Sequence, residues 1–159
     1  MHIKPYKQPI RSFSQQHSVD LLRLDMVHPI VSGNKFYKLR FYIEEAITNG
    51  VNTVASFGGP YSNHIVALAF TAKEAGLKSI GYIRTNEHEP LTPSLVEAKS
   101  YGMELVYLGR TDFQSKKAAM IQTSSNMPNC YWVDEGGYGP IGAKGAATIL
   151  TENDTSDYD

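Results

Sequence analysis

The sequence predicts an α/β fold, an open twisted parallel sheet with helices on both faces. Short apolar runs with the composition of strands alternate with longer stretches in which apolar residues recur at helical spacing. Glycines and prolines separate the two kinds of segment. Such alternation is typical of strand–helix–strand units joined by right-handed crossovers, in which all strands run parallel.

The predicted elements follow an irregular N-terminal region, residues 1–33, which is interrupted by three prolines and contains one possible strand at 19–27. The predicted strands are residues 53–57, 78–84, 104–108 and 130–133. The predicted helices are residues 36–50, 62–76, 92–101, about 112–121 and 143–152. Thr92 is an expected N-cap with Pro93 at the first helical position, and Thr111 or Asp112 is expected to cap the fourth helix.

Composition limits the class of protein. The chain has 159 residues, 42% hydrophobic and 19% charged, with a net charge of −1, which fits one globular domain. The near-zero charge argues against binding to nucleic acid or a membrane surface, because no basic excess neutralises phosphates. The single cysteine, Cys130, excludes an intramolecular disulfide framework, and the five histidines show no metal-ligand spacing. No run is long enough to span a membrane, and the N-terminus resembles no signal peptide, so a cytoplasmic protein without a metal is expected.

The first candidate site is the loop at residues 57–64, at the carboxyl end of the first predicted strand, where parallel sheets bind ligands. Gly58 and Gly59 allow a ligand to approach the backbone closely. Ser62 and Asn63 then open a helix, whose free N–H groups favour a carboxylate or a phosphate. A purely structural alternative stays open, in which Ser62 is an N-cap and the glycines form a tight turn.

The second candidate is a group of three cations, Lys35, Lys38 and Arg40, at the start of the helix predicted at 36–50. Cations are electrostatically disfavoured at a helix N-terminus, which suggests a functional reason for them. A lysine here could face an anionic ligand or, when partly desolvated, supply the neutral amine that Schiff-base chemistry requires. A solvated cationic turn is the structural alternative.

A third motif is rejected as a nucleotide site. Residues 137–142 match the pattern G-x-G-x-x-G, but Pro140 lies inside it and no second strand with an acidic residue follows. Lys144 is misplaced for a phosphate-binding loop. Trp132 is expected in the core rather than in a stacking platform.

Several motifs taken together resemble one enzyme family. They are Gly33-Asn34-Lys35, Lys38-Leu39, Gly58-Gly59, Ser62-Asn63-His64 and Glu135-Gly136-Gly137. This set is similar to that of the 1-aminocyclopropane-1-carboxylate (ACC) deaminases and D-cysteine desulfhydrases, pyridoxal-phosphate enzymes with the tryptophan-synthase-β type of fold. The resemblance implies conversion of a small amino acid, ACC or D-cysteine, to a 2-oxo acid and ammonia.

The resemblance also implies roles for particular residues. Lys35 would form the Schiff base with pyridoxal phosphate and shuttle protons, and Lys38 would approach the cofactor phosphate. Asn63 would bind the phenolic oxygen of the cofactor. Ser62 would hold the substrate carboxylate together with the N–H groups of Asn63 and His64, and would assist catalysis.

The chain departs from the family pattern at a few positions. Ser32 stands where a glycine is usual, Tyr37 where an arginine is usual, and the glutamine before the serine of the second motif is replaced by Tyr61. His64 is more like the desulfhydrases than the strict deaminases. These departures affect the expected substrate more than the expected cofactor.

The resemblance implies a longer protein with a dimeric or other homo-oligomeric assembly. It assigns residues 1–45 to the N-terminal segment of a large domain, 46–142 to a small α/β domain with four parallel strands, and 143–159 to the start of the return into the large domain. The acidic end, residues 151–159, follows a predicted helix where another strand would be expected. We therefore interpret the chain as an N-terminal half, although a disordered tail is also consistent. The alternative function is a non-catalytic truncated small domain that binds an anion or a partner.

Overall fold

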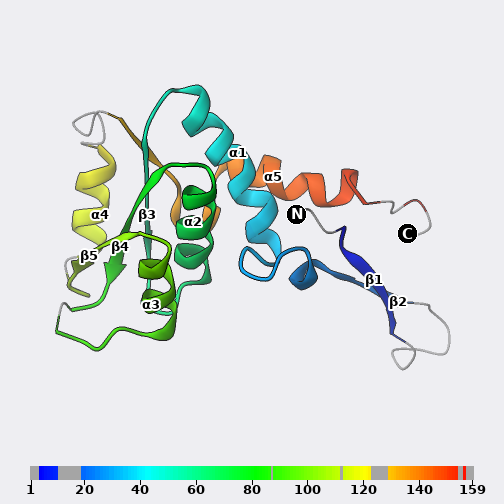
Figure 1. The fold of residues 1–159 in the computed structure, drawn as a ribbon, viewed down its shortest axis with the longest axis horizontal. Coiled ribbons are helices and arrows are strands. Elements are labelled where there is room, and N and C mark those ends of the chain that lie inside the picture. The colour runs from blue at the N-terminus through cyan, green and yellow to red at the C-terminus, as the bar shows by residue number, and fades with distance from the viewer. Residues whose placement is uncertain are drawn as a thin grey trace.

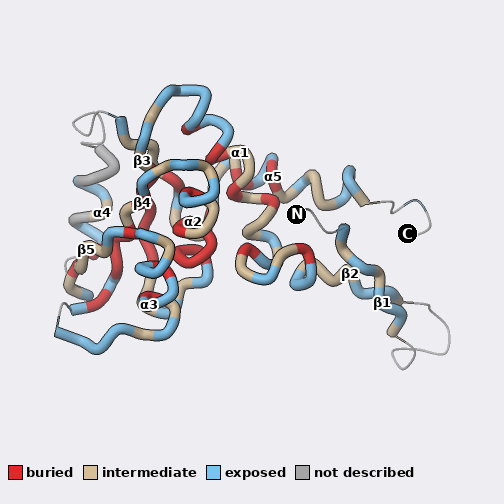
Figure 2. Tube along the Cα trace, in the orientation of Figure 1, coloured by how far each residue is buried: buried red, intermediate tan, exposed pale blue. Residues whose placement is uncertain are grey.

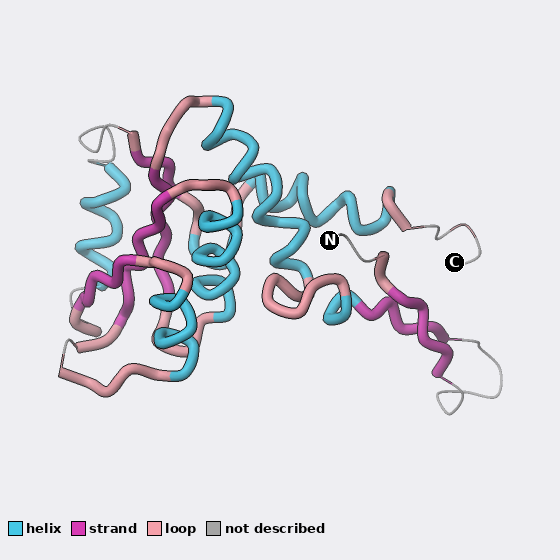
Figure 3. The backbone as a smooth tube through the Cα atoms, viewed as in Figure 1, coloured by secondary structure: helices cyan, strands magenta, loops and turns pink. Residues whose placement is uncertain are grey.

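Four parallel strands form the central sheet of the computed structural model, which describes residues 4–10, 19–86, 88–111, 113–122, 129–153 and 156. The sheet order is β5-β4-β3-β6 (Figure 1 and Figure 3). The strands are β3 Thr53–Gly58, β4 Lys78–Arg84, β5 Glu104–Leu108 and β6 Cys130–Trp132. The prediction of an open parallel sheet is confirmed, and the four strands lie within two residues of their expected bounds.

Helices cover both faces of this sheet, as expected. They are α1 Asn34–Thr48, α2 Asn63–Glu74 and α3 Pro93–Ser100 on one face and α4 Phe113–Gln122 on the other. The fifth helix, α5 Pro140–Thr151, packs against α1. Thr92 caps α3 through its side chain and Pro93 occupies the first turn, as predicted. The expected cap Asp112 lies outside the described residues.

Two hydrophobic clusters, one on each face, form the core (Figure 2). Successive strand residues point to opposite faces, so Val54 packs with α1, α2 and α3 while Phe57 packs on the side of α4. On that second side the Trp132 ring stacks on Phe57 at 5.2 Å and on Tyr82 at 5.4 Å. Trp132 therefore packs against the core, as expected.

The N-terminal region is more regular than the sequence indicated. Residues Tyr6–Ile10 form β1, which pairs antiparallel with β2, Val19–Arg23, and Leu24–Met26 form a 3-10 turn. The expectation of an irregular region was wrong for β1, because Pro9 suggested a break. A two-stranded ribbon has only outer edges, and proline is tolerated there. Figure 1 shows this ribbon at the opposite end of the molecule from α4.

One glycine of α5, Gly145, allows the helix to lie directly against α1. Gly142 and Gly145 are the buried residues of α5, and a Cβ on Gly145 would lie 2.2 Å from the backbone oxygen of Tyr37. The helix begins at Pro140, three residues before the predicted start, because proline at the first turn is compatible with a helix. Gly142, the last glycine of the pattern rejected as a nucleotide site, instead packs against the Gly137 carbonyl at the start of α5.

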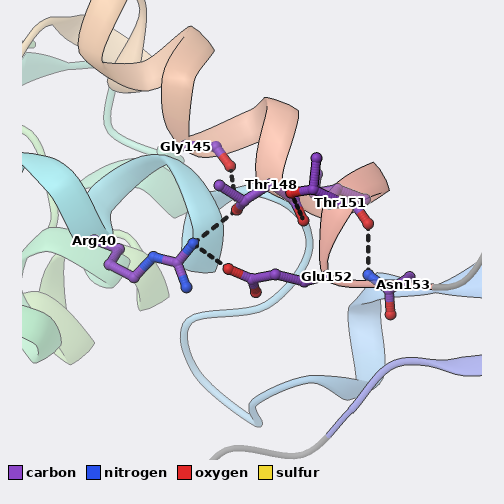
Figure 4. Close-up of polar contacts among 7 residues, drawn as sticks. Arg40, Gly145, Thr148, Thr151, Glu152 and Asn153 are labelled. Carbon is purple, nitrogen blue, oxygen red and sulfur yellow. Dashed lines mark hydrogen bonds and ion pairs between the residues drawn. The ribbon is translucent and has the colours of Figure 1, made fainter.

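Polar contacts reinforce the same pair of helices (Figure 4). The Nη2 atom of Arg40 donates to Thr148 Oγ1 at 2.7 Å and to Glu152 Oε1 at 2.6 Å. Arg40, one of the three cations at the start of α1, therefore has a structural partner at the end of α5.

None of the helices in the described part of the chain is both long and apolar enough to cross a bilayer. Within the same residues no group of three or more His, Cys, Asp and Glu side chains is placed to hold a metal ion. The boundary inferred at residue 45 lies inside α1, which ends at Thr48.

The close approach of α1 and α5 can be tested with Gly145→Ala. Alanine favours an isolated helix by about 1 kcal/mol, but here its methyl group would overlap the backbone of α1. We expect a net loss of about 1–3 kcal/mol in the free energy of unfolding, measured by urea denaturation. Leu150→Ala, at a 64% exposed position of the same helix, is the control and should change it by about 0.5 kcal/mol or less. A Gly145→Ala chain as stable as the parent would contradict this packing.

Candidate active site

Lys35, in the first turn of α1, is the centre of the candidate site. Its Nζ donates a hydrogen bond to the carbonyl oxygen of Gly136 at 2.8 Å. Partial burial lowers the pKa of Lys35 below its ordinary value, and the nearby charge of Lys38 lowers it further. A larger fraction of neutral amine is therefore available than at an exposed lysine.

The N-terminus of α2 lies at the carboxyl end of β3, as expected for a ligand site in a parallel sheet. Ser62 is the N-cap, and its Oγ accepts from the N–H of Ile65 at 3.4 Å. A Cβ on Gly58, the last residue of β3, would lie 2.6 Å from the Ile65 side chain, so a larger residue there would displace Ile65. Ser62 is therefore an N-cap, as the structural alternative predicted. Because its Oγ accepts in this contact, the hydroxyl proton is still available for donation.

Lys35 and Asn63 line the same cavity, whose volume is about 430 Å³. Asn63 is exposed at the first position of α2. Ser94 and Glu97, one turn apart on α3, also line this cavity. Sequence reasoning missed them, although a polar pair at helical spacing after β4 was a possible signal.

The other expected site residues lie elsewhere. Lys38 lines a second cavity of about 430 Å³ together with Gly137, Tyr138 and Pro140 at the start of α5. Ser62 and His64 are not among the residues that line the first cavity. The structure therefore brings Lys35 and Asn63 together and places Lys38 on a neighbouring surface.

The His64 side chain is buried beneath the site. Its Nε2 shares a hydrogen bond of 2.8 Å with Ser56 Oγ of β3, and its Nδ1 has no partner in the described part of the chain. Burial, followed by the charges of Lys35 and Lys38, lowers the pKa of His64 to about 3. The imidazole is neutral at physiological pH, so it adds no third positive charge. Ser56 was missed, since a lone serine in an apolar strand gives only a weak signal.

The loop at residues 134–138 reaches Lys35 from the other end of the chain. Asp134 Oδ2 accepts from the Tyr42 hydroxyl at 3.0 Å, and Glu135 pairs with Lys117 of α4 at 2.5 Å. Gly136 has a φ of 71°, in the left-handed region that favours glycine. The motif Glu135-Gly136-Gly137 was recognised in the sequence, but its anchors Tyr42 and Asp134 were not.

The fold and these positions define an α/β protein with a partly desolvated lysine amine at the ligand-binding end of a parallel sheet. No protein-family model matches the chain. It is 28% identical over 152 residues to a Thermotoga maritima protein named "Putative 1-aminocyclopropane-1-carboxylate deaminase", a match that covers 91% of this chain and 48% of that protein. A Pyrococcus horikoshii protein of the same name is also 28% identical, with 93% of this chain and 48% of the relative covered. An ACC deaminase of Rhizobium leguminosarum is 40% identical over 50 residues, 31% of this chain and 15% of that protein.

Solved structures also match the fold of this chain. The structure of an ACC deaminase homologue matches with a TM-score of 0.75 at 22% identity, over 96% of this chain and 49% of that one. A hydrogen sulfide-producing enzyme of Fusobacterium nucleatum matches with a TM-score of 0.59 at 15% identity, over 80% of this chain and 41% of that one. The chain thus resembles ACC deaminases, as inferred from its motifs, and it spans about half the length of the curated relatives it matches.

The burial of His64 predicts how stability depends on pH. The folded pKa, about 3, lies below the ordinary value of 6.5, so between these values only the unfolded chain binds a proton here. Stability is lost as the pH falls through this window, by about 1–2 kcal/mol between pH 6.5 and pH 5.

Urea denaturation at both pH values should therefore show a smaller loss in His64→Gln than in the parent chain. His88→Gln, which replaces an exposed histidine, is the control and should behave like the parent. An equal loss in His64→Gln and the parent would mean that His64 is not held neutral.

Proposed function

We propose that this chain is part of a pyridoxal-phosphate-dependent enzyme that converts a small amino acid to a 2-oxo acid and ammonia. The observation that carries the proposal is the shared cavity of Lys35 and Asn63, with the Lys35 amine partly buried. The similarity to ACC deaminases over 91% of the chain supports the same reaction class. ACC and D-cysteine are the two candidate substrates.

The residues present fit this cofactor. The cavity of about 430 Å³ has room for an aromatic ring, and the residues that line it include the amine of Lys35 and the amide of Asn63. When bound, pyridoxal phosphate supplies an aldehyde that reacts with an amine and a ring that accepts electrons. The lowered pKa of Lys35 suits both attack by its neutral amine and later transfer of protons.

The neighbouring residues are assigned binding functions in this proposal. The Asn63 side-chain amide would donate a hydrogen bond to the phenolic oxygen of the cofactor. Lys38, from the neighbouring cavity, would contribute positive charge toward the cofactor phosphate. Ser62 and the N–H groups of Asn63 and His64 hold the substrate carboxylate at the start of α2, where the helix dipole favours an anion. The hydroxyl of Ser62 would also assist catalysis, because it can still donate a hydrogen bond.

We also propose the domain organisation that the resemblance to ACC deaminases implies. Residues 46–142 correspond to a small domain, and residues 1–45 and 143–159 to parts of a large domain. A homodimer in the cytoplasm is proposed for the whole protein. The near-neutral charge of −1 supports a small-molecule partner rather than nucleic acid.

Cofactor capture tests the proposal directly. The chain is mixed with pyridoxal phosphate and treated with borohydride, and peptide mass spectrometry locates the cofactor. We expect the adduct on Lys35, its loss in Lys35→Ala and its retention in Lys99→Ala, which removes an exposed lysine of α3. Assays of ammonia release from ACC and from D-cysteine then identify the substrate.

A folded chain that forms no adduct at Lys35 with excess pyridoxal phosphate would overturn the proposal. That result would favour the non-catalytic alternative, in which the start of α2 binds an anion or a partner. An adduct spread evenly over the exposed lysines would also overturn the proposal.

A further inference from the structure

We infer that the loop at residues 134–138 positions the Lys35 amine, and that Tyr42 is the positioning residue that fixes this loop. Tyr42 lies two turns along α1 from Lys35 and is itself buried. A role of this positioning in catalysis rests on the proposed function. The positioning itself concerns only the Lys35 amine and does not require a cofactor.

The Gly136 carbonyl is the atom that holds the amine. Its oxygen lies 2.8 Å from Lys35 Nζ, although the two residues are 101 positions apart in the sequence. Gly136 is left-handed, with a φ of 71°, and a Cβ there would lie 3.8 Å from the same nitrogen. The glycine therefore gives its carbonyl this direction while leaving the space around the amine open.

The Tyr42 hydroxyl ties the loop to α1 at two points. It lies 3.0 Å from Asp134 Oδ2 and contacts the backbone oxygen of Tyr138, so it donates to one of these acceptors at a time. The two acceptors flank Gly136 on both sides. A hydrogen bond from Gly137 N–H to the Asp134 carbonyl, 2.8 Å long, closes the loop between them.

A second anchor comes from the opposite side of the sheet. Lys117 of α4 pairs with Glu135 at 2.5 Å, with side chains that are 23% and 38% exposed. Because Glu135 directly precedes Gly136, this pair limits the movement of the same carbonyl. Tyr42 and Lys117 thus hold the loop from α1 and from α4.

The charged groups around the Lys35 amine show why its pKa depends on its position. Lys38 of α1 lies close enough to lower the pKa of Lys35, while His64 of α2 is held neutral. The carboxylates of Asp134 and Glu135 are engaged by Tyr42 and Lys117. An amine released from Gly136 would gain water, and its pKa would return toward the ordinary value.

Trace acetylation tests the positioning without any cofactor. The chain is labelled with limiting acetic anhydride over a range of pH, and peptide mass spectrometry gives the labelling midpoint of each lysine. In the parent chain, Lys35 should have its midpoint below the ordinary lysine value. In Tyr42→Phe, the Lys35 midpoint should move up toward that value, by about half a pH unit or more.

Tyr131→Phe is a closely matched control. Tyr131 of β6 also donates its hydroxyl to a carboxylate, Glu45 Oε2, at 2.6 Å, and its ring lies 6.4 Å from that of Tyr42. This contact does not involve the loop, so the Lys35 midpoint should stay at the parent value. Circular dichroism checks that both variants are folded.

Glu135→Gln provides a second variant if Tyr42→Phe does not fold, because it weakens the anchor from α4 at a less buried position. It should shift the Lys35 midpoint in the same direction. A parent-like midpoint in the folded variants would overturn the inference, as would an equal shift in Tyr131→Phe. Failure of cofactor capture with an intact acetylation pattern would contradict the proposed function and leave the positioning of Lys35 standing.

Discussion

The close contact between α1 and α5 is the constraint on which the candidate site depends. The two helices approach until the Gly145 Cα lies against the backbone of Tyr37, and no larger residue fits there. This approach brings the loop that precedes α5 over the first turn of α1. Gly136 then meets Lys35, so a packing requirement far along the chain sets the environment of the amine.

Sequence patterns predicted the sheet well, because each strand and helix carries its own local signal. Lys78–Arg84 and Glu104–Leu108 have the bounds that their apolar runs indicated, and Thr92-Pro93 marked the start of α3. β1 was missed because the pairing of Tyr6–Ile10 with Val19–Arg23 depends on the partner strand rather than on local composition. Proline in an outer strand gives the same signal as proline in a loop.

The sequence predicted those residues of the candidate site that lie in local motifs. Lys35 and Asn63 were found from the motifs around them, and the structure places both on one cavity. Tyr42 and Asp134 were not found, because their contact joins distant segments of the chain. Ser56 was not found, because a lone serine in an apolar strand does not reveal its partner His64. A tyrosine on an apolar helix face and a serine in a buried strand are ordinary core residues until the fold shows their partners.

The buried His64 side chain adds no positive charge near Lys35 and Lys38. Lys35 and Lys38 already raise the cost of a further cation, and His64 is neutral beneath them. A neutral imidazole can fill that space and bond to Ser56 without repelling the amine. The same charges make an anion favourable at the neighbouring start of α2, where the helix dipole adds to them. The charges of the lysines and the dipole at the start of α2 thus act in the same direction, because each would stabilise an anionic ligand placed there.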